Sequence, residues 1–125
     1  MPQEDNMSGT GSHTTYKEPS ITSGTAITDA IQLDGQTPAA IQTPAALTGT
    51  QFSFDCAVST TGTFAPLYNT DGTEFLVDVG TSRHIWLDPR VFAGVRSIKI
   101  RSGTVGTPTN EAATRTIVLI VRDID

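Results

Sequence analysis

The clearest pattern along the chain is an alternation of apolar and polar residues in short segments. In residues 51–59, Phe52, Phe54, Cys56 and Val58 share one face, and mostly polar side chains share the other. Because successive side chains of a strand point to opposite faces, the pattern predicts a strand with these four residues in the core. Further short strands are predicted over 64–68, 75–79, 84–87 and 97–101.

Turn signals separate these segments. A first strand is predicted over 27–33, ending at an Asp-Gly pair at 34–35, and a second strong turn signal occupies 69–72. Asp88 followed by Pro89 predicts a single helical turn, because Asp accepts hydrogen bonds from free N–H groups and Pro fits the first helical position.

A six-residue motif occurs twice in succession, as TPAAIQ over 37–42 and TPAALT over 43–48. Proline has no N–H group to donate to a neighbouring strand, so it is rare in central strands. Pro38 and Pro44 therefore predict an edge strand or an extended loop over 37–48.

The last predicted strand is apolar on both faces. One face carries Val118 and Ile120, and the other carries Ile117, Leu119 and Val121. A sandwich core covers only one face, so the other needs a neighbouring subunit or another part of the chain. Flanking charges discourage aggregation of such a strand, and arginines at 115 and 122 fit that role.

Together, these segments predict an all-β fold of about eight short strands, arranged as an antiparallel β-sandwich. A jelly roll is the preferred form of this sandwich. The chain divides into a polar extended arm over 1–15, expected to be flexible in isolation, and a β-sandwich domain over 16–125.

Composition excludes several classes of function. Charged residues make up 17% of the chain, the formal net charge is −5, and the eight Lys and Arg residues are scattered, so no nucleic-acid partner is expected. No apolar stretch reaches the ~20 residues that cross a bilayer, so no membrane partner is expected. Cys56 is the single cysteine, so no internal disulfide can form.

The sequence offers few residues in spacings that would suit catalysis or metal binding. His84 lies near Ser82 and Asp88 in the sequence, but a shared strand would hold the first two roughly 7 Å apart, too far for a triad. Zinc needs more Cys and His ligands than are present. Calcium bound by oxygens of Asp71, Thr73 and Glu74, with Asp78 as a further ligand, is less favoured than a hairpin turn at Asp71-Gly72. We therefore expect no enzyme activity, metal or cofactor.

Trp86 is the most informative single side chain. It is the one tryptophan of the chain. In the predicted strand it shares a face with His84, and Arg83 lies three residues before it. If exposed, it would suit stacking on a sugar or anchoring a partner protein. The alternative is a half-buried tryptophan that belongs to the core.

Three stretches, TAITDAIQLDG (25–35), TFAPLYNTDGTEFLV (63–77) and RHIWLDPRVFAGVRSIKIRSGT (83–104), resemble small β-sandwich virion proteins of tailed bacteriophages. The segment 87–103 is also similar to discoidin-like sandwiches. The first resemblance implies a capsid cement or decoration protein in the virion, a homodimer or homotrimer that clamps subunits of the major capsid protein. A tail, neck or baseplate component and a carbohydrate-binding module that contacts host glycans are the alternatives.

The expected contact surface combines the arm, the proline-rich repeat, the exposed aromatic and the outer face of 115–122. The residues predicted to contact a subunit or the capsid are Pro2, Asp5, Met7, His13, Pro38, Pro44, Trp86, Arg115, Val118, Ile120 and Arg122.

Overall fold

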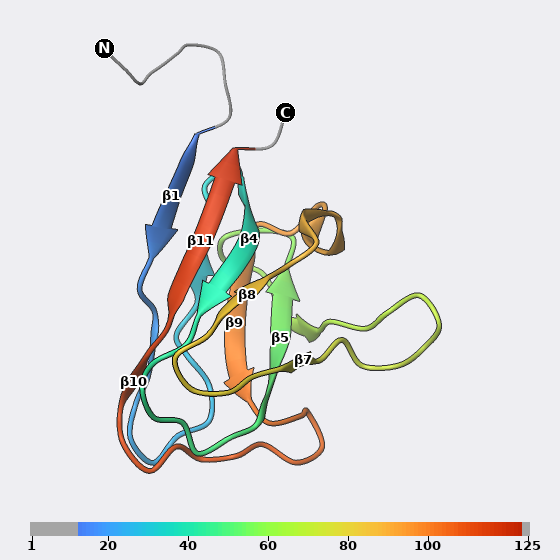
Figure 1. Cartoon of the computed structure of the whole chain (residues 1–125). Coiled ribbons are helices and arrows are strands. Elements are labelled where there is room, and N and C mark those ends of the chain that lie inside the picture. The colour runs from blue at the N-terminus through green and yellow to red at the C-terminus, as the bar shows by residue number, and fades with distance from the viewer. Residues whose placement is uncertain (1–12, 124–125) are drawn as a thin grey trace, which may run out of the picture.

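The computed structural model describes residues 13–123, which form two antiparallel sheets packed face to face and a small third sheet (Figure 1). Sheet I has the strand order β1 (Thr14–Lys17), β11 (Val118–Asp123), β4 (Gln36–Gln42) and β8 (His84–Trp86). Sheet II has the order β3 (Ile31–Gln32), β9 (Ser97–Ser102), β5 (Gln51–Ala57) and β6 (Ala65–Pro66), with β7 (Val77–Asp78) also paired to β5. The third sheet joins β2 (Ser20–Ile21) to β10 (Arg115–Thr116).

The predicted antiparallel β-sandwich is confirmed, whereas its jelly-roll connectivity stays a prediction. The predicted helical turn is present as a 3₁₀ helix, η1 (Pro89–Phe92). Asp88 caps it by accepting a 3.0 Å hydrogen bond from the Arg90 N–H. Hydrogen bonds from the Arg90 side chain and backbone lower the pKa of the exposed Asp88 carboxyl.

The core lies between the two sheets and contains the alternating apolar residues of both. The rings of the buried Phe54 and Phe92 and of the partly buried Phe75 lie 5.4–6.1 Å apart, two of the three pairs edge to face. Cys56, which the alternation predicts in the core, is half-buried and packs against the core from its margin. Burial, together with the charge of Asp55, raises the pKa of its thiol to about 11, which makes the thiol a poor nucleophile.

The prediction that proline keeps residues 37–42 out of a central strand is wrong. β4 lies between β11 and β8, with Pro38 buried within it. The strand accommodates the proline at a β-bulge: Pro38 is opposite Val121 and Ala40 is opposite Ile120, so Ala39 has no partner on β11. A bulge interrupts the ladder where a missing N–H costs least.

Two strand boundaries also differ from the prediction. β5 ends at Ala57, after which the chain bends, so Val58 is 82% exposed instead of lying in the core. The strand expected over 27–33 shrinks to Ile31–Gln32, with Ile27 forming an isolated bridge to Arg101. In both places the apolar–polar alternation of the sequence extends beyond the residues that pair with a neighbouring strand, so the predicted strand is longer than the observed one.

The first strand begins inside the range that the sequence assigns to the arm. Thr14 pairs with Arg122, and the His13 carbonyl accepts a 3.0 Å hydrogen bond from the Asp123 N–H. β1 is thereby an edge strand of sheet I. The predicted contact residues Pro2, Asp5 and Met7 lie outside the described residues.

A buried carboxylate joins three separate segments of the chain. Glu111 is 1% exposed and accepts hydrogen bonds from the Thr48 and Gly49 N–H groups, the Ser102 hydroxyl and Arg115 Nε, at 2.6–2.9 Å. Burial acts to raise the pKa of Glu111, but these hydrogen bonds outweigh it and lower the pKa to about 2. A Cβ at position 49 would collide with Ser102 Oγ, so only glycine permits this approach.

We expect Glu111→Gln to lower the free energy of unfolding by about 3 kcal/mol, because the substitution leaves the Arg115 charge buried without its partner. Urea unfolding at neutral pH measures the effect. Asp29→Asn is the matched control, since Asp29 is exposed and its removal should change stability by less than about 0.5 kcal/mol. Equal stability of the Glu111 variant and the parent chain would contradict the assignment.

Acid should remove the contribution of Glu111 to the free energy of unfolding. The pKa of Glu111 is about 2 in the folded chain and has the ordinary value of 4.5 in the unfolded chain. As the pH falls, the carboxylate is therefore protonated in the unfolded chain before it is protonated in the folded chain, which favours unfolding. The resulting stabilisation, about 3 kcal/mol, is complete above the ordinary pKa and is lost as the pH falls toward the folded value. The stability difference between the parent chain and Glu111→Gln should therefore be smaller near pH 3 than at neutral pH. A constant difference would exclude this linkage.

Candidate functional site

Sheet I has an inner face in the core and an outer face turned away from sheet II. Leu119 and Val121 of β11, with Ile117 just before it, have no exposed area and form part of the core. Val118 and Ile120 point to the outer face and are partly exposed. Of the two apolar sets in the last strand, Val118 and Ile120 are therefore the set that the sandwich core does not cover.

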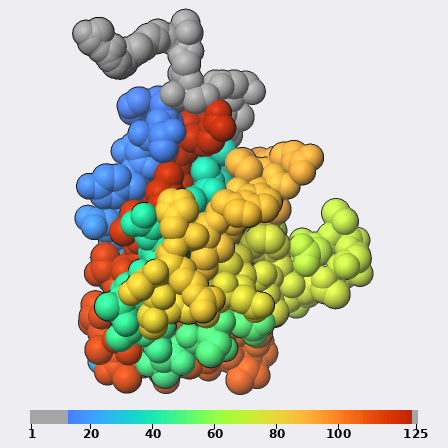
Figure 2. Space-filling model, in the orientation of Figure 1, coloured from blue at the N-terminus to red at the C-terminus, as the bar shows by residue number. Residues whose placement is uncertain are grey.

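Four residues form a row across all strands of this outer face, which we call the aromatic row. Tyr16 lies opposite Ile120, Ile120 opposite Ala40, and Ala40 opposite Trp86. Tyr16 on the edge strand β1 is 60% exposed and Trp86 on the edge strand β8 is 75% exposed, whereas Ala40 on the central strand β4 is 6% exposed. In Figure 2 the atoms of β1 (blue), β11 (red), β4 (teal) and β8 (gold) lie beside one another on the side that faces the viewer.

A second, more polar row runs beside the first, and we call it the polar row. Val118 lies opposite Gln42, which in turn lies opposite His84. The Gln42 amide nitrogen and His84 Nδ1 are 3.1 Å apart. Glu18 directly follows β1 at the other edge of the sheet and lines one depression together with Gln42 and Val118, so we include it in the polar row.

The two rows enclose a shallow trough near β1. It has a volume of about 350 Å³ and is lined by Tyr16, Glu18, Gln42, Val118 and Ile120. An exposed aromatic side chain thus borders a depression with an apolar floor and a polar rim.

The composition of the outer face is typical of a protein contact surface. Where the two rows cross the central strands, the side chains are uncharged and mostly apolar, and the edges of the aromatic row carry a tyrosine and a tryptophan. Interface centres are depleted in charged residues and enriched in aromatic ones, and Trp and Tyr most often contribute the largest share of binding energy. The geometry therefore suits recognition of a partner.

The structure brings together part of the predicted contact set. Trp86, Val118 and Ile120 share the outer face, and Arg122 lies two residues further along β11 from Ile120. Pro38 is buried within β4, and Pro44 lies in the loop after β4, where its carbonyl accepts a hydrogen bond from the Ser82 N–H.

Two predicted contact residues lie elsewhere. Arg115 is turned into the molecule, where its Nε donates to Glu111 at 2.9 Å and 14% of its side chain is exposed. It belongs to the buried ion pair and does not reach the outer face. His13 is exposed at the start of β1, beyond the end of both rows.

Several residues of the surface were missed by the sequence analysis, namely Tyr16, Glu18, Ala40 and Gln42. The alternation in Thr14–Lys17 was a usable signal, but it falls at the boundary assigned to the arm. The pairing of the first strand with the last could not be recognised without the topology.

Residues considered for catalysis and metal binding have other partners. His84 binds Gln42, and Asp88 binds Arg90. Asp71 accepts hydrogen bonds from the N–H and hydroxyl of Thr73, which is a turn geometry. Within residues 13–123, no group of three or more His, Cys, Asp or Glu side chains could hold a metal ion.

Over the same described range, no helix has the length and apolar character needed to cross a membrane.

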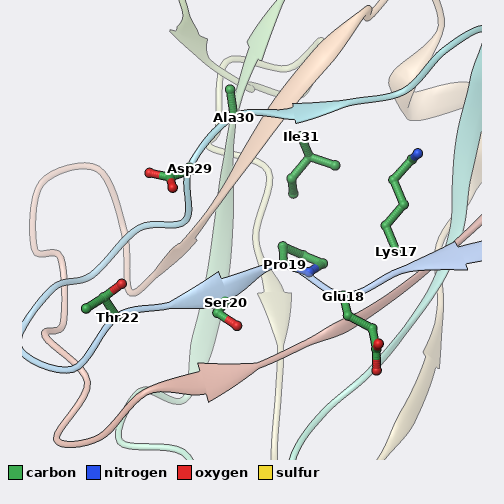
Figure 3. A pocket seen from close by; sticks show the side chains of 8 residues that line it. All are labelled: Lys17, Glu18, Pro19, Ser20, Thr22, Asp29, Ala30 and Ile31. Atoms are coloured by element: carbon green, nitrogen blue, oxygen red, sulfur yellow. The ribbon is translucent and has the colours of Figure 1, made fainter.

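A second depression, of about 390 Å³, lies between the segments 17–22 and 29–31 (Figure 3). The side chain of Ile31 points toward Pro19 across it, whereas Glu18 points away (Figure 3). Lys17 at its rim forms a 3.5 Å ion pair with Asp34. Polar groups do not converge in this depression, so it is the weaker candidate.

Comparison with known proteins gives a likeness in fold. No protein-family model matches the chain, and no curated protein matches it. The structure is similar to the crystal structure of the SPBc2 prophage-derived protein YomS, with a TM-score of 0.57 over 94% of this chain and 100% of that chain. Sequence identity is 14%, so the likeness concerns the fold.

Because Trp86 is 75% exposed, Trp86→Ala should change the free energy of unfolding by less than about 1 kcal/mol. Phe54→Ala, which empties a position with no exposed area, should cost about 3–5 kcal/mol. Urea unfolding followed by circular dichroism at low protein concentration compares the two. A large loss of stability in the Trp86 variant would show that this side chain belongs to the core.

Proposed function

We propose that this chain is a structural protein of a tailed-phage virion, and that it acts as a capsid cement or decoration protein that bridges subunits of the major capsid protein. The observation that carries the proposal is the outer face of sheet I, with Trp86 and Tyr16 exposed at its edges and Val118 and Ile120 at its centre. A freely diffusing protein rarely exposes such a face, and assembly into a virion would cover it, either with a capsid subunit or with a second copy of this chain that bridges capsid subunits.

Two further observations support the phage assignment. The fold is similar to that of a prophage-derived protein, and three stretches of the sequence resemble small virion proteins. The candidate site also offers exposed aromatic and apolar side chains, which are the groups that contribute most to protein contacts.

A cement protein gains affinity from the number of equivalent contacts that it makes with the shell. A closed shell presents many equivalent sites, and a unit that engages two of them at once converts the second contact into an intramolecular one. Each contact can then be modest in strength. We propose that residues 1–12, which precede β1 at the edge of sheet I, supply part of the contact with the shell.

A glycan is the second candidate ligand, and one observation favours it. Trp86 is an exposed ring with the imidazole of His84 and the amide of Gln42 in the adjacent row. Aromatic rings stack on apolar sugar faces, and neighbouring amides and imidazoles can bind hydroxyl groups. In this case the chain would contact host glycans as part of a head or tail fibre.

Co-sedimentation with matching phage heads that lack this protein tests the proposal. We expect saturable binding, with a stoichiometry fixed by the number of capsid subunits. Deletion of residues 2–12 should weaken this binding and leave the melting temperature nearly unchanged, because no described strand begins before Thr14.

Asp29→Asn, an exposed change away from sheet I, serves as the matched control and should bind as the parent chain does. Failure of the parent chain to bind heads would exclude the cement function. Binding to isolated tails, or saturable quenching of Trp86 fluorescence by oligosaccharides, would identify the alternative.

A further inference from the structure

We propose that the outer face of sheet I pairs with the same face of a second copy of this chain, about a twofold axis that runs parallel to the strands between β11 and β4. The inference rests on the proposed function and deepens it, because it names the occupant of the same surface. It follows from the order of residues in the aromatic row and the polar row.

The aromatic row matches itself when it is reversed. The twofold rotation places β1 of one copy over β8 of the other, with corresponding rows at the same height. Tyr16 then lies over Trp86 of the second copy, and Ile120 lies over Ala40 of the second copy. The larger aliphatic residue meets the small one, and the two exposed rings meet at each edge.

Sheet twist explains why this arrangement of sizes is useful. Two twisted sheets packed face to face approach closely at the centre, about 10 Å apart, and diverge toward their corners. Small or partly buried side chains are therefore needed at the centre and large ones at the edges. The outer face has Ala40 and Ile120 on its central strands and Trp86 and Tyr16 on its edge strands.

The trough gives the tryptophan a place to pack. In the paired arrangement, the Trp86 ring of one copy reaches the β1 side of the other, where the trough of about 350 Å³ lies beside Tyr16. The twofold axis repeats this contact, so each copy provides one projecting ring and one depression. Such reciprocity is what an isologous interface requires.

The hydrogen-bonding groups of the polar row are also complementary under the same rotation. Glu18 stands at the β1 edge and His84 at the β8 edge, so each carboxylate lies over the imidazole of the other copy. Within one chain, the edge strands are three strand spacings apart, roughly 14 Å, too far for a direct pair. With the Gln42 amide nitrogen donating to His84 Nδ1, the Nε2–H remains to donate to a carboxylate.

This pairing would supply what a bridging protein needs. A single small domain with one shell-binding region holds one capsid subunit, whereas a twofold dimer presents two such regions. The outer face would then join the copies, and surfaces outside it would contact the shell.

Analytical ultracentrifugation of the full chain over a range of concentrations tests the inference. We expect a species of twice the 13.2 kDa chain mass, and we expect Trp86→Ala to raise the dimer Kd about 30-fold or more. Asp29→Asn is the control and should leave the Kd unchanged. Trp86 is the one tryptophan, so its fluorescence should become less accessible to acrylamide as the dimer forms.

A charge exchange provides the specific readout. His84→Glu should raise the Kd about tenfold, because two carboxylates then face each other, and Glu18→Lys added to it should restore most of the affinity. A general structural disturbance would not be rescued by a change at the opposite edge of the sheet.

A chain that stays monomeric at all concentrations, or a dimer that Trp86→Ala leaves intact, would overturn the inference. So would failure of the charge exchange to restore pairing. Head binding by a monomeric chain would preserve the cement function without this pairing, and a dimer that does not bind heads would preserve the pairing without the cement function.

Discussion

Both the core and the candidate surface depend on the placement of β11 in the middle of sheet I. Its inward residues Leu119 and Val121 have no exposed area, and its neighbours β1 and β4 are held in register on either side. In a strand, fixing one face fixes the other, because a slip of one residue would exchange them. Burial of the core set therefore obliges Val118 and Ile120 to face outward. The apolar outer face is thus a consequence of the same pairing that builds the sandwich.

Much of the fold was predictable because alternation and turn chemistry are local properties. The strand at 51–57, the 3₁₀ turn after Asp88 and the all-β sandwich all follow from short-range patterns. The failures needed information from distant residues. Pro38 is tolerated in a central strand because of a bulge against β11, Val58 leaves the core because no partner strand continues beside it, and Glu111 is satisfied by groups far from it in the sequence.

The candidate surface was only partly predictable, for a related reason. Two apolar faces on the last strand indicated that one face would need a cover, and that inference selected Val118 and Ile120 among its alternatives. Tyr16 and Ala40 became part of the surface only through pairing across the sheet. The stabilising ion pair of Glu111 and Arg115 lies elsewhere, where Glu111 also binds the backbone of Thr48 and Gly49. Recognition and stability are therefore assigned to separate groups of residues.

The hydrogen bond between the Asp123 N–H and the His13 carbonyl has a consequence for the connectivity of the chain. It brings the first and last described strands together at one corner of sheet I, while the turn over 68–74 projects from the opposite side (Figure 1). A short linker can therefore join Asp123 to His13, and new termini can be opened in that projecting turn. Such a circular permutant would keep every strand pairing of sheet I, because the sheet depends on which strands are neighbours and not on their order along the chain.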